Sequence, residues 1–363
     1  RSNHSFNVTT NGGVIIRSMT QSKGGYACSS DLLRVKVKNK ELYFREGRSR
    51  KGKALKDEMV LIPKNKTITI NDMACEGHIT LKLDTRRNKL YVINTLDIDD
   101  YVYSVLFYES YQTWPLEMQK VQAVVSRTYA LYQMMANKRN VHLPYDIKNN
   151  NFHQRYRGTH EYLHLKQAVD ETKNLVLTHQ GKFALAMFDA CCGGVVPAKI
   201  GWFNFKEAPY LARKKACDYC KKYKLYSWNG ETTIDKFMDG LRSYGPLKNR
   251  LKNIGEVKGL KTKKRDKEGL LSRFEIQGDR KQICVSGKEI WNAMGKTFKS
   301  QCITMRKEKN KLFYWGKGFG HHIGLCQRGA RELVRKKWPL KKILSFYYPG
   351  TKLQQWRVVL KQG

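Results

Sequence analysis

The hydrophobic pattern of this chain changes its period at about residue 95, and that change limits the folds available to it. Before this point, apolar and polar residues alternate in short segments, as in the strands of a half-exposed sheet; the clearest cover residues 32–38, 41–46, 66–70 and 78–84. After it, residues 98–110 carry apolar side chains on one helical face, behind two aspartates that favour a helix N-terminus. The sequence therefore predicts a β-rich N-terminal region over residues 1–95, followed by helices.

Residues 113–138 form the most regular helical pattern. Thr113 can cap this helix and Pro115 suits its first turn. Lys120 and Arg127 are seven residues apart, so we expect them to project from the same side of the helix. Two basic side chains on one face can bind an anionic or hydroxyl-rich substrate, or they can simply be solvated.

The rest of the chain mixes short helices and strands. Residues 160–174 predict a second helix, and residues 175–190 predict a strand pair that ends at the sequence CCGG. The stretch 231–305 is rich in lysine and has its own helix and strand pattern, so we interpret it as a small α+β insertion. The predicted fold class is α+β, with a mixed helical core in two parts, 96–230 and 306–363, on either side of the insertion.

A strong positive charge is the main feature of the composition. Lysine and arginine number 69 against 31 acidic residues, a formal net charge of +38. Such a field attracts polyanions, namely nucleic acid, anionic lipid or an acidic cell-wall polymer, although it also serves solubility. The basic residues are scattered, and no zinc-finger spacing, helix-turn-helix or aromatic RNA-binding motif is present. We therefore expect no specific nucleic-acid partner.

The chain has no apolar run long enough to predict a membrane span. It begins with Arg1 rather than methionine, which suits a processed or truncated chain. We therefore expect that a signal peptide or a membrane anchor could precede this sequence.

Nine cysteines are present, and an odd number leaves at least one free thiol or ligand if the others pair. Cys217 and Cys220 have the C-x-x-C spacing of a zinc knuckle, and Cys192 lies within reach of a zinc loop. Only one of the neighbours Cys191 and Cys192 is expected to face the metal. A fourth ligand is then missing, for which Cys191 or His153 is a candidate. A disulfide between Cys217 and Cys220, or free buried thiols, are the alternatives to a structural zinc site.

Glu109 is the carboxylate with the most unusual surroundings in the sequence. It lies at the end of the helix predicted over residues 98–110, just before the turn into the next helix, close to four aromatic residues: Phe107, Tyr108, Tyr111 and Trp114. Removal from water raises a carboxyl pKa toward neutrality, which suits a general acid. The alternative is an ordinary solvated glutamate at the end of a helix.

The segment GKGFGHHIGLCQRGA, residues 316–330, is rich in glycine and contains two adjacent histidines. It does not follow a clear strand in a βαβ unit, so it does not fit a dinucleotide-binding loop. Adjacent histidines tend to point apart, and neither has a ligand-type partner four residues on. A tight glycine loop that presents one histidine and one glutamine to a cleft fits the pattern better.

Taken together, these segments resemble a known family. Residues 101–131, YVYSVLFYESYQTWPLEMQKVQAVVSRTYAL, resemble the signature of the stage II sporulation protein D family of bacterial peptidoglycan lytic transglycosylases. FDACCGG at 188–194, the glycine-rich segment at 316–330 and ILSFYYPGT at 343–351 resemble further motifs of that family, in the same order.

The resemblance implies roles for individual residues. Glu109 falls on the catalytic glutamate. The residues implied to bind substrate are Lys120, Gln122, Arg127, Tyr129, Gly193, His321 and Gln327. The chain departs from the family pattern at His322, where glycine is usual, and at Cys326, where serine is usual. Cys191 and Val195 also alter the motif around CCGG.

The implied reaction is cleavage of the β-1,4 bond between N-acetylmuramic acid and N-acetylglucosamine, in glycan strands stripped of peptides, with formation of 1,6-anhydro ends. Glu109 would be the single acid and base, and the chemistry would need no cofactor. A non-catalytic amidase enhancer is the alternative within the family's relatives, and a basic nucleic-acid-binding protein is a third. The expected partners are peptidoglycan glycan strands and other wall hydrolases such as an amidase. The expected location is exported: periplasmic, or elsewhere in the extracytoplasmic cell envelope.

Overall fold

The computed structural model describes residues 5–18, 25–49, 51–55, 58–87, 89–138, 143–150 and 153–360. The chain divides into two compact units, Arg1–Lys173 and Asn174–Gly363. The boundary falls inside the predicted core segment 96–230, so the motif around Glu109 and the glycine-rich motif belong to different units. Each unit is described by itself.

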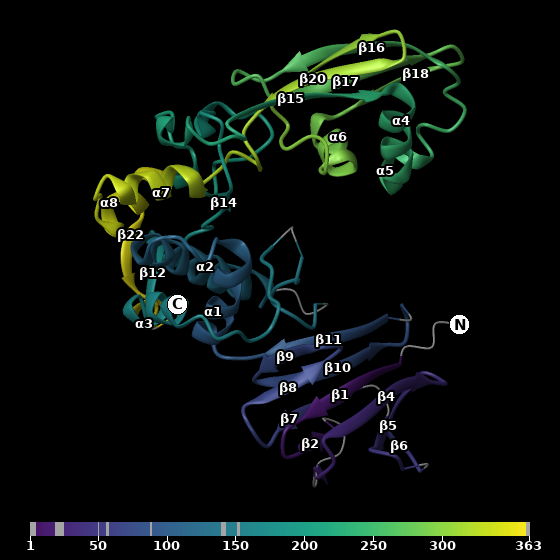
Figure 1. Ribbon diagram of the computed structural model, residues 1–363, viewed down its shortest axis with the longest axis vertical. Helices are drawn as coiled ribbons and strands as arrows, with labels where there is room; N and C mark the ends of the chain where they lie inside the picture. Colours follow the sequence, from purple (N-terminus) through teal and green to yellow (C-terminus); the bar gives the residue numbers. More distant parts are fainter. Residues whose placement is uncertain are drawn as a thin grey trace. The chain divides into compact units, whose positions relative to one another are not determined.

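Two antiparallel sheets make up the N-terminal part of the first unit (Figure 1). One sheet has the strand order β6 (Lys53–Leu55), β5 (Glu41–Glu46), β4 (Leu32–Lys38), β1 (Ser5–Thr10), β8 (Thr67–Ile70) and β9 (Met73–Glu76). The other has the order β11 (Lys89–Thr95), β10 (His78–Asp84), β7 (Glu58–Pro63), β2 (Val14–Arg17) and β3 (Tyr26–Cys28). The predicted β-rich N-terminus is confirmed, with β4, β5 and β10 at the predicted bounds.

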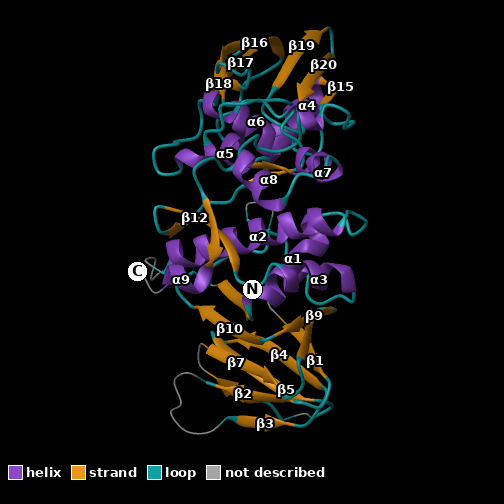
Figure 2. Ribbon diagram, turned by 90° about the vertical axis from the view of Figure 1, so that its left-hand side faces the viewer, coloured by secondary structure: helices purple, strands orange, loops and turns teal. Residues whose placement is uncertain are grey.

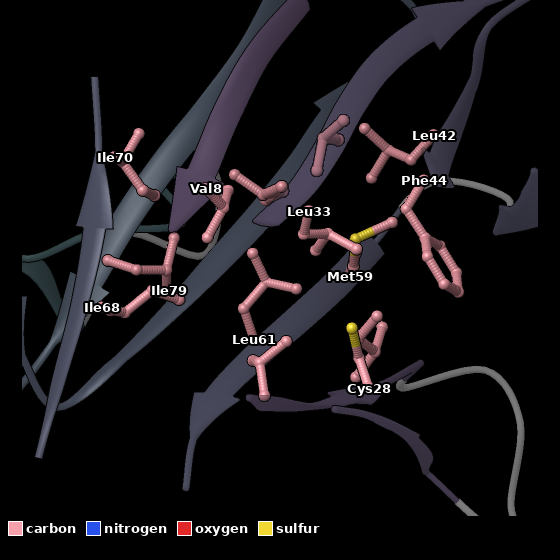
Figure 3. Packing of buried hydrophobic residues seen from close by; sticks show 14 of the residues in the cluster. Val8, Cys28, Leu33, Leu42, Phe44, Met59, Leu61, Ile68, Ile70 and Ile79 are labelled. Carbon is pink, nitrogen blue, oxygen red and sulfur yellow. The ribbon is translucent and has the colours of Figure 1, made fainter. Parts of the chain in front are cut away.

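The alternating pattern of these strands produces a single core between the two sheets. Val8 of β1 pairs with Leu33 of β4 and with Ile70 of β8, so apolar side chains line up across neighbouring strands. These side chains and Leu61 of the other sheet are buried in one cluster (Figure 3). Burial of alternate residues from both sheets is the packing of a β-sandwich.

In the described part of the first unit, the strands are followed by the helices α1 (Ile98–Glu109), α2 (Leu116–Asn137) and α3 (Leu163–Glu171). The Asp97 side chain caps α1 by accepting the Asp99 N–H at 2.8 Å. The predicted cap of α2 is wrong: this helix begins at Leu116 behind Pro115, and Thr113 lies in the turn before it. The proline fixes the backbone at the helix start, so the helix begins without a side-chain cap.

The second unit contains the glycine-rich motif and the predicted insertion. β12 (Leu175–His179) pairs antiparallel with β13 (Lys182–Phe183) and with β22 (Lys352–Gln355). β14 (Phe188–Asp189) pairs parallel with β21 (Leu325–Cys326). The strand expected over 183–190 is therefore reduced to two short pieces. Helices α7 (Gln327–Arg335), α8 (Leu340–Tyr347) and α9 (Trp356–Leu360) follow near the C-terminus.

The insertion has a core of its own. One of its sheets is β15 (Ser227–Thr233), β20 (Lys311–Lys317) and β19 (Ile303–Glu308); the other is β16 (Val257–Arg265), β17 (Leu271–Gly278) and β18 (Gln282–Val285). The helices α4 (Ile234–Ser243), α5 (Gly245–Lys248) and α6 (Gly287–Met294) lie below these strands in Figure 2. Their buried side chains form one cluster that reaches Leu312, beyond the predicted limit of residue 305. The α+β fold class is confirmed.

Among the described residues, no helix combines the length and the apolar composition that crossing a membrane requires.

Candidate functional site

Glu109 is the last residue of α1 and is half-buried. Its Oε1 accepts the backbone N–H of Arg155 at 2.7 Å. Burial raises the pKa of the Glu109 carboxyl above its usual value, although the hydrogen bond and the charge of Arg155 act in the opposite direction. A carboxyl group of this kind gives up a proton less readily than a solvated glutamate does, as a general acid requires.

Aromatic side chains surround this end of α1, as the sequence predicts. The Phe107 ring contacts the rings of Tyr108, His160 and Tyr162, with centroids 4.6, 4.7 and 4.9 Å apart. Tyr108 and Tyr162 are nevertheless 42% and 45% exposed. Tyr111, in the turn after Glu109, is 52% exposed. Exposed flat rings at this end of α1 offer stacking surfaces for an amphipathic ring such as a sugar.

A buried hydrogen-bond pair holds the turn that follows Glu109. The Ser110 hydroxyl donates to Gln119 Oε1 at 2.7 Å, and Gln119 Nε2 donates to the Tyr111 carbonyl at 2.7 Å. Both side chains are buried. They fix the turn between α1 and α2, and with it the position of Glu109; sequence reasoning missed both residues, because the contact joins side chains nine positions apart across a turn.

Both basic residues of α2 form ion pairs with carboxylates. Lys120 Nζ contacts Glu117 at 2.7 Å and also contacts Glu171. Arg127 is fully buried and its Nε donates to Asp99 Oδ1 at 2.8 Å. Its Nη1 donates to the Thr172 carbonyl at 2.9 Å.

Arg127 therefore does not fit the sugar-binding role expected from the sequence. The helical spacing identified the correct face of α2, but α3 packs on that face and covers it. The guanidinium instead joins the start of α1 to the end of α3. Lys120 remains partly accessible, with 16% of its side chain exposed.

Gln122 and Tyr129 are also inside the first unit. Gln122 is fully buried and its Nε2 donates to the Ser126 hydroxyl at 3.2 Å. Burial raises the pKa of Tyr129 to about 12, so its hydroxyl stays protonated, and it shares a hydrogen bond of 3.2 Å with His153 Nδ1. These contacts support the packing around α2. His153, one of the two candidates for a fourth metal ligand, is therefore hydrogen-bonded to Tyr129 in the first unit.

In the second unit, the loop at CCGG is joined to the glycine-rich segment by backbone hydrogen bonds. Gly193 has a φ of +61°, and a Cβ atom on it would lie 2.5 Å from the Gly318 nitrogen. Cys191 and Phe319 exchange backbone hydrogen bonds of 3.1 and 2.7 Å. The close approach requires glycine at 193, so this residue acts through its backbone.

The two adjacent histidines have different surroundings. His321 is half-buried, and its Nδ1 accepts the Ile323 N–H at 3.1 Å. His322 is buried with a φ of +68°, a conformation that explains why glycine is usual in the family at this position. Its N–H donates to Asp189 Oδ2 at 2.7 Å and its Nδ1 to the Cys192 carbonyl at 2.9 Å. Burial lowers the pKa of both imidazoles to about 4, so both are neutral at pH 7.

Gln327 begins α7 and is 7% exposed. Next to it, Cys326 caps the same helix with its side chain. The sulfur atoms of Cys192, Cys217, Cys220 and Cys326 lie within 4.8 Å of one another, and all four residues are buried. The fourth cysteine of this cluster is thus Cys326, whereas the sequence suggested Cys191 or His153 as a fourth ligand. The only sequence signal for it was the cysteine in place of the family's serine.

The family model described as stage II sporulation protein matches residues 86–179, and a model of a domain of unknown function matches residues 151–324. An uncharacterized protein of Brachyspira hyodysenteriae is 30% identical over 75% of this chain and 71% of its own length. Stage II sporulation protein D of Bacillus subtilis is 23% identical over 81% of this chain and 86% of its own length. The amidase enhancer of Bacillus subtilis is 26% identical over 66% of this chain, but only 38% of that protein is covered.

Proposed function

This chain belongs to the stage II sporulation protein D family, which is associated with the cell wall, and we propose that it is a peptidoglycan lytic transglycosylase. The observation that carries the proposal is Glu109: a half-buried carboxyl with a raised pKa, at the position of the family's catalytic glutamate, at a helix end that also carries exposed aromatic rings. The proposed substrate is the β-1,4 bond between N-acetylmuramic acid and N-acetylglucosamine.

One carboxyl group suffices for this reaction, in contrast to hydrolytic glycosidases, which normally use two. Protonated Glu109 gives its proton to the glycosidic oxygen while the bond from that oxygen to muramic C1 breaks. The resulting carboxylate then takes the proton of the muramic C6 hydroxyl, whose oxygen bonds to C1. The product is a 1,6-anhydro ring, no water is consumed, and Glu109 is protonated again. Because the nucleophile is part of the substrate, much of the entropic barrier is already removed.

Substrate binding is proposed to use the exposed aromatic side chains of the first unit and the positive charge of the chain. Tyr108, Tyr111 and Tyr162 would stack on sugar rings. Glycan strands without stem peptides carry free lactyl carboxylates, and a protein with a net charge of +38 favours such an anionic polymer. In the second unit, the half-buried His321 is the proposed sugar contact, whereas Gln327, which the family resemblance also implies, is 7% exposed and could reach a sugar only through that small surface. The chemistry needs no cofactor, and the proposed place of action is outside the cytoplasm.

The test is the substitution Glu109→Gln, with peptide-free glycan as substrate and mass spectrometry of the products. We expect the release of 1,6-anhydro sugars to fall by at least about 1,000-fold, because the amide can neither donate nor accept the transferred proton. Glu308→Gln, the same chemical change at an exposed carboxylate of β19, should retain full activity. Undiminished product from Glu109→Gln would overturn the assignment.

A role as an amidase enhancer is the second candidate, because one of the similar proteins carries that name. The two functions separate in one assay, in which a peptidoglycan amidase digests cell walls with and without this protein. Stimulation that is equal for the native chain and for Glu109→Gln, together with no anhydro products from either, would favour the enhancer.

A further inference from the structure

We propose that Cys192, Cys217, Cys220 and Cys326 bind one structural zinc ion as a tetrathiolate site in the second unit. The proposal is independent of the proposed enzyme activity. It rests on the geometry of four side chains that three distant segments of the chain bring together.

The distances between the sulfur atoms fit a tetrahedral zinc ion. Zinc–sulfur bonds of about 2.3 Å in a tetrahedron place the sulfur atoms about 3.8 Å apart. Cys192 Sγ and Cys220 Sγ are 3.7 Å apart, and all four sulfur atoms lie within 4.8 Å of one another. A disulfide needs about 2.05 Å. All nine cysteines lie in the described part of the chain, and none of them is disulfide-bonded.

Two backbone N–H groups point at the sulfur atom of Cys326. Cys326 Sγ accepts the N–H of Cys192 at 3.3 Å and the N–H of Gly329 at 3.4 Å. It does so at the start of α7, where the helix dipole favours negative charge. Amide hydrogen bonds to sulfur stabilise the deprotonated form that binds zinc.

Gly329 leaves just enough room for the sulfur atoms. A Cβ atom at this position would lie 2.5 Å from Cys217 Sγ and 3.4 Å from Cys326 Sγ. Because residue 329 is glycine, the first turn of α7 can pass close to the sulfur atoms.

Side chains around the cluster complete a second layer of contacts. The hydroxyl of Tyr347, fully buried, lies 3.2 Å from Cys217 Sγ. At this distance the hydroxyl can donate a hydrogen bond to a Cys217 thiolate. Contacts of this kind orient the ligands of metal sites.

Arg213 supplies a positive charge next to this layer. It is 2% exposed, its guanidinium lies 5.7 Å from the centre of the Tyr347 ring, and its Nη1 donates to the Lys215 carbonyl. Among the described residues, its Nε and Nη2 have no hydrogen-bond partner. A buried cation requires a nearby negative charge. Four thiolates around Zn²⁺ carry a net charge of −2, which Arg213 would partly offset.

A zinc ion bound by these four cysteines would hold three segments of the second unit together. The zinc ion would join the CCGG loop, the C-x-x-C segment and the start of α7. Through the Cys192 carbonyl, which accepts from His322, it would also hold the turn that carries His321. We infer a structural role, because the four protein ligands leave no open position for a substrate.

The first experiment is elemental analysis of the chain purified without chelators, together with X-ray absorption at the zinc edge. We expect one zinc ion per chain with four sulfur neighbours at about 2.3 Å. A chain that contains no zinc and takes up neither Zn²⁺ nor Co²⁺ after reduction would overturn the proposal. So would intact-mass analysis showing two disulfides among these four cysteines.

The second experiment compares two variants. Cys326→Ser introduces the residue that is usual in the family and should weaken zinc binding by at least about 10-fold in a chelator competition. Cys284→Ser, at a half-exposed cysteine of β18, should bind zinc like the native chain. If Cys326→Ser fails to fold, Co²⁺ added to the reduced native chain decides: sulfur-to-cobalt charge-transfer absorption supports the site, and its absence contradicts it. Unchanged zinc affinity in a folded Cys326→Ser also contradicts it.

Discussion

In the first unit, Glu109, Lys120 and Arg127 are positioned by helices that pack on one another, whereas in the second unit His321, His322 and Cys326 are positioned by tight turns and by contacts among sulfur atoms. Packing of the three helices distributes the stabilisation over many apolar contacts, and the buried Arg127 also forms an ion pair with Asp99. The second arrangement depends on a few positions with left-handed backbone and on four cysteines. Substitutions should therefore have different consequences in the two units.

The largest effect is expected from Arg127→Met in the first unit. Removing this guanidinium leaves Asp99 and two carbonyl groups without their buried partner. The free energy of unfolding should fall by about 3–5 kcal/mol, as for other broken buried ion pairs. Lys120→Met is the control: this ion pair is partly exposed, and we expect a loss of no more than about 1 kcal/mol. Chemical denaturation of both variants measures the difference. Equal losses would contradict the structural role of Arg127.

An intermediate effect is expected from Gly193→Ala in the second unit. The new Cβ would lie 2.5 Å from the Gly318 nitrogen, at a φ of +61°. We expect a loss of about 2–4 kcal/mol from backbone strain and overpacking. Gly245→Ala is a matched control, because nothing lies within 4 Å of its added Cβ. Thermal unfolding should separate the two variants, and a native melting temperature for Gly193→Ala would show that the two loops can move apart at little cost.

The smallest effect concerns the pH dependence that Glu109 gives to the first unit. Its pKa is raised in the folded chain above the usual value of 4.5, so the folded state binds the proton more tightly than the unfolded state does. Its contribution to stability is therefore present at low pH and is lost as the pH rises through the raised pKa. Glu109→Gln, which mimics the protonated form, should be slightly more stable than the native chain at pH 7, and the difference should vanish toward pH 4. Denaturation at both pH values tests this; a variant less stable than the native chain at pH 7 would contradict it.

The same difference between the units explains what the sequence could predict. Periodicity depends on neighbouring residues, so it identified α1, α2 and the face of α2 that carries Lys120 and Arg127. It could not show that α3 covers Arg127, because that contact joins residues more than forty positions apart. The cap at Thr113 was wrong, since Pro115 already fixes the start of the helix.

The cysteine cluster shows the other limit. The C-x-x-C spacing indicated a knuckle, because Cys217 and Cys220 are close in sequence. Cys326 was noticed only as a departure from the family pattern, since parallel pairing of β14 with β21 is what brings it next to Cys192. Similarly, the φ of His322 gives the physical reason for glycine at this position in the family, a reason that the sequence alone did not reveal.

The central claim is that Glu109 cleaves glycan without water, and digestion of peptide-free glycan in ¹⁸O-labelled water tests it most directly. We predict that the native chain releases products with 1,6-anhydro ends that contain no ¹⁸O. Products with ¹⁸O-labelled reducing ends would identify a hydrolase and contradict the account, as would the absence of any cleavage.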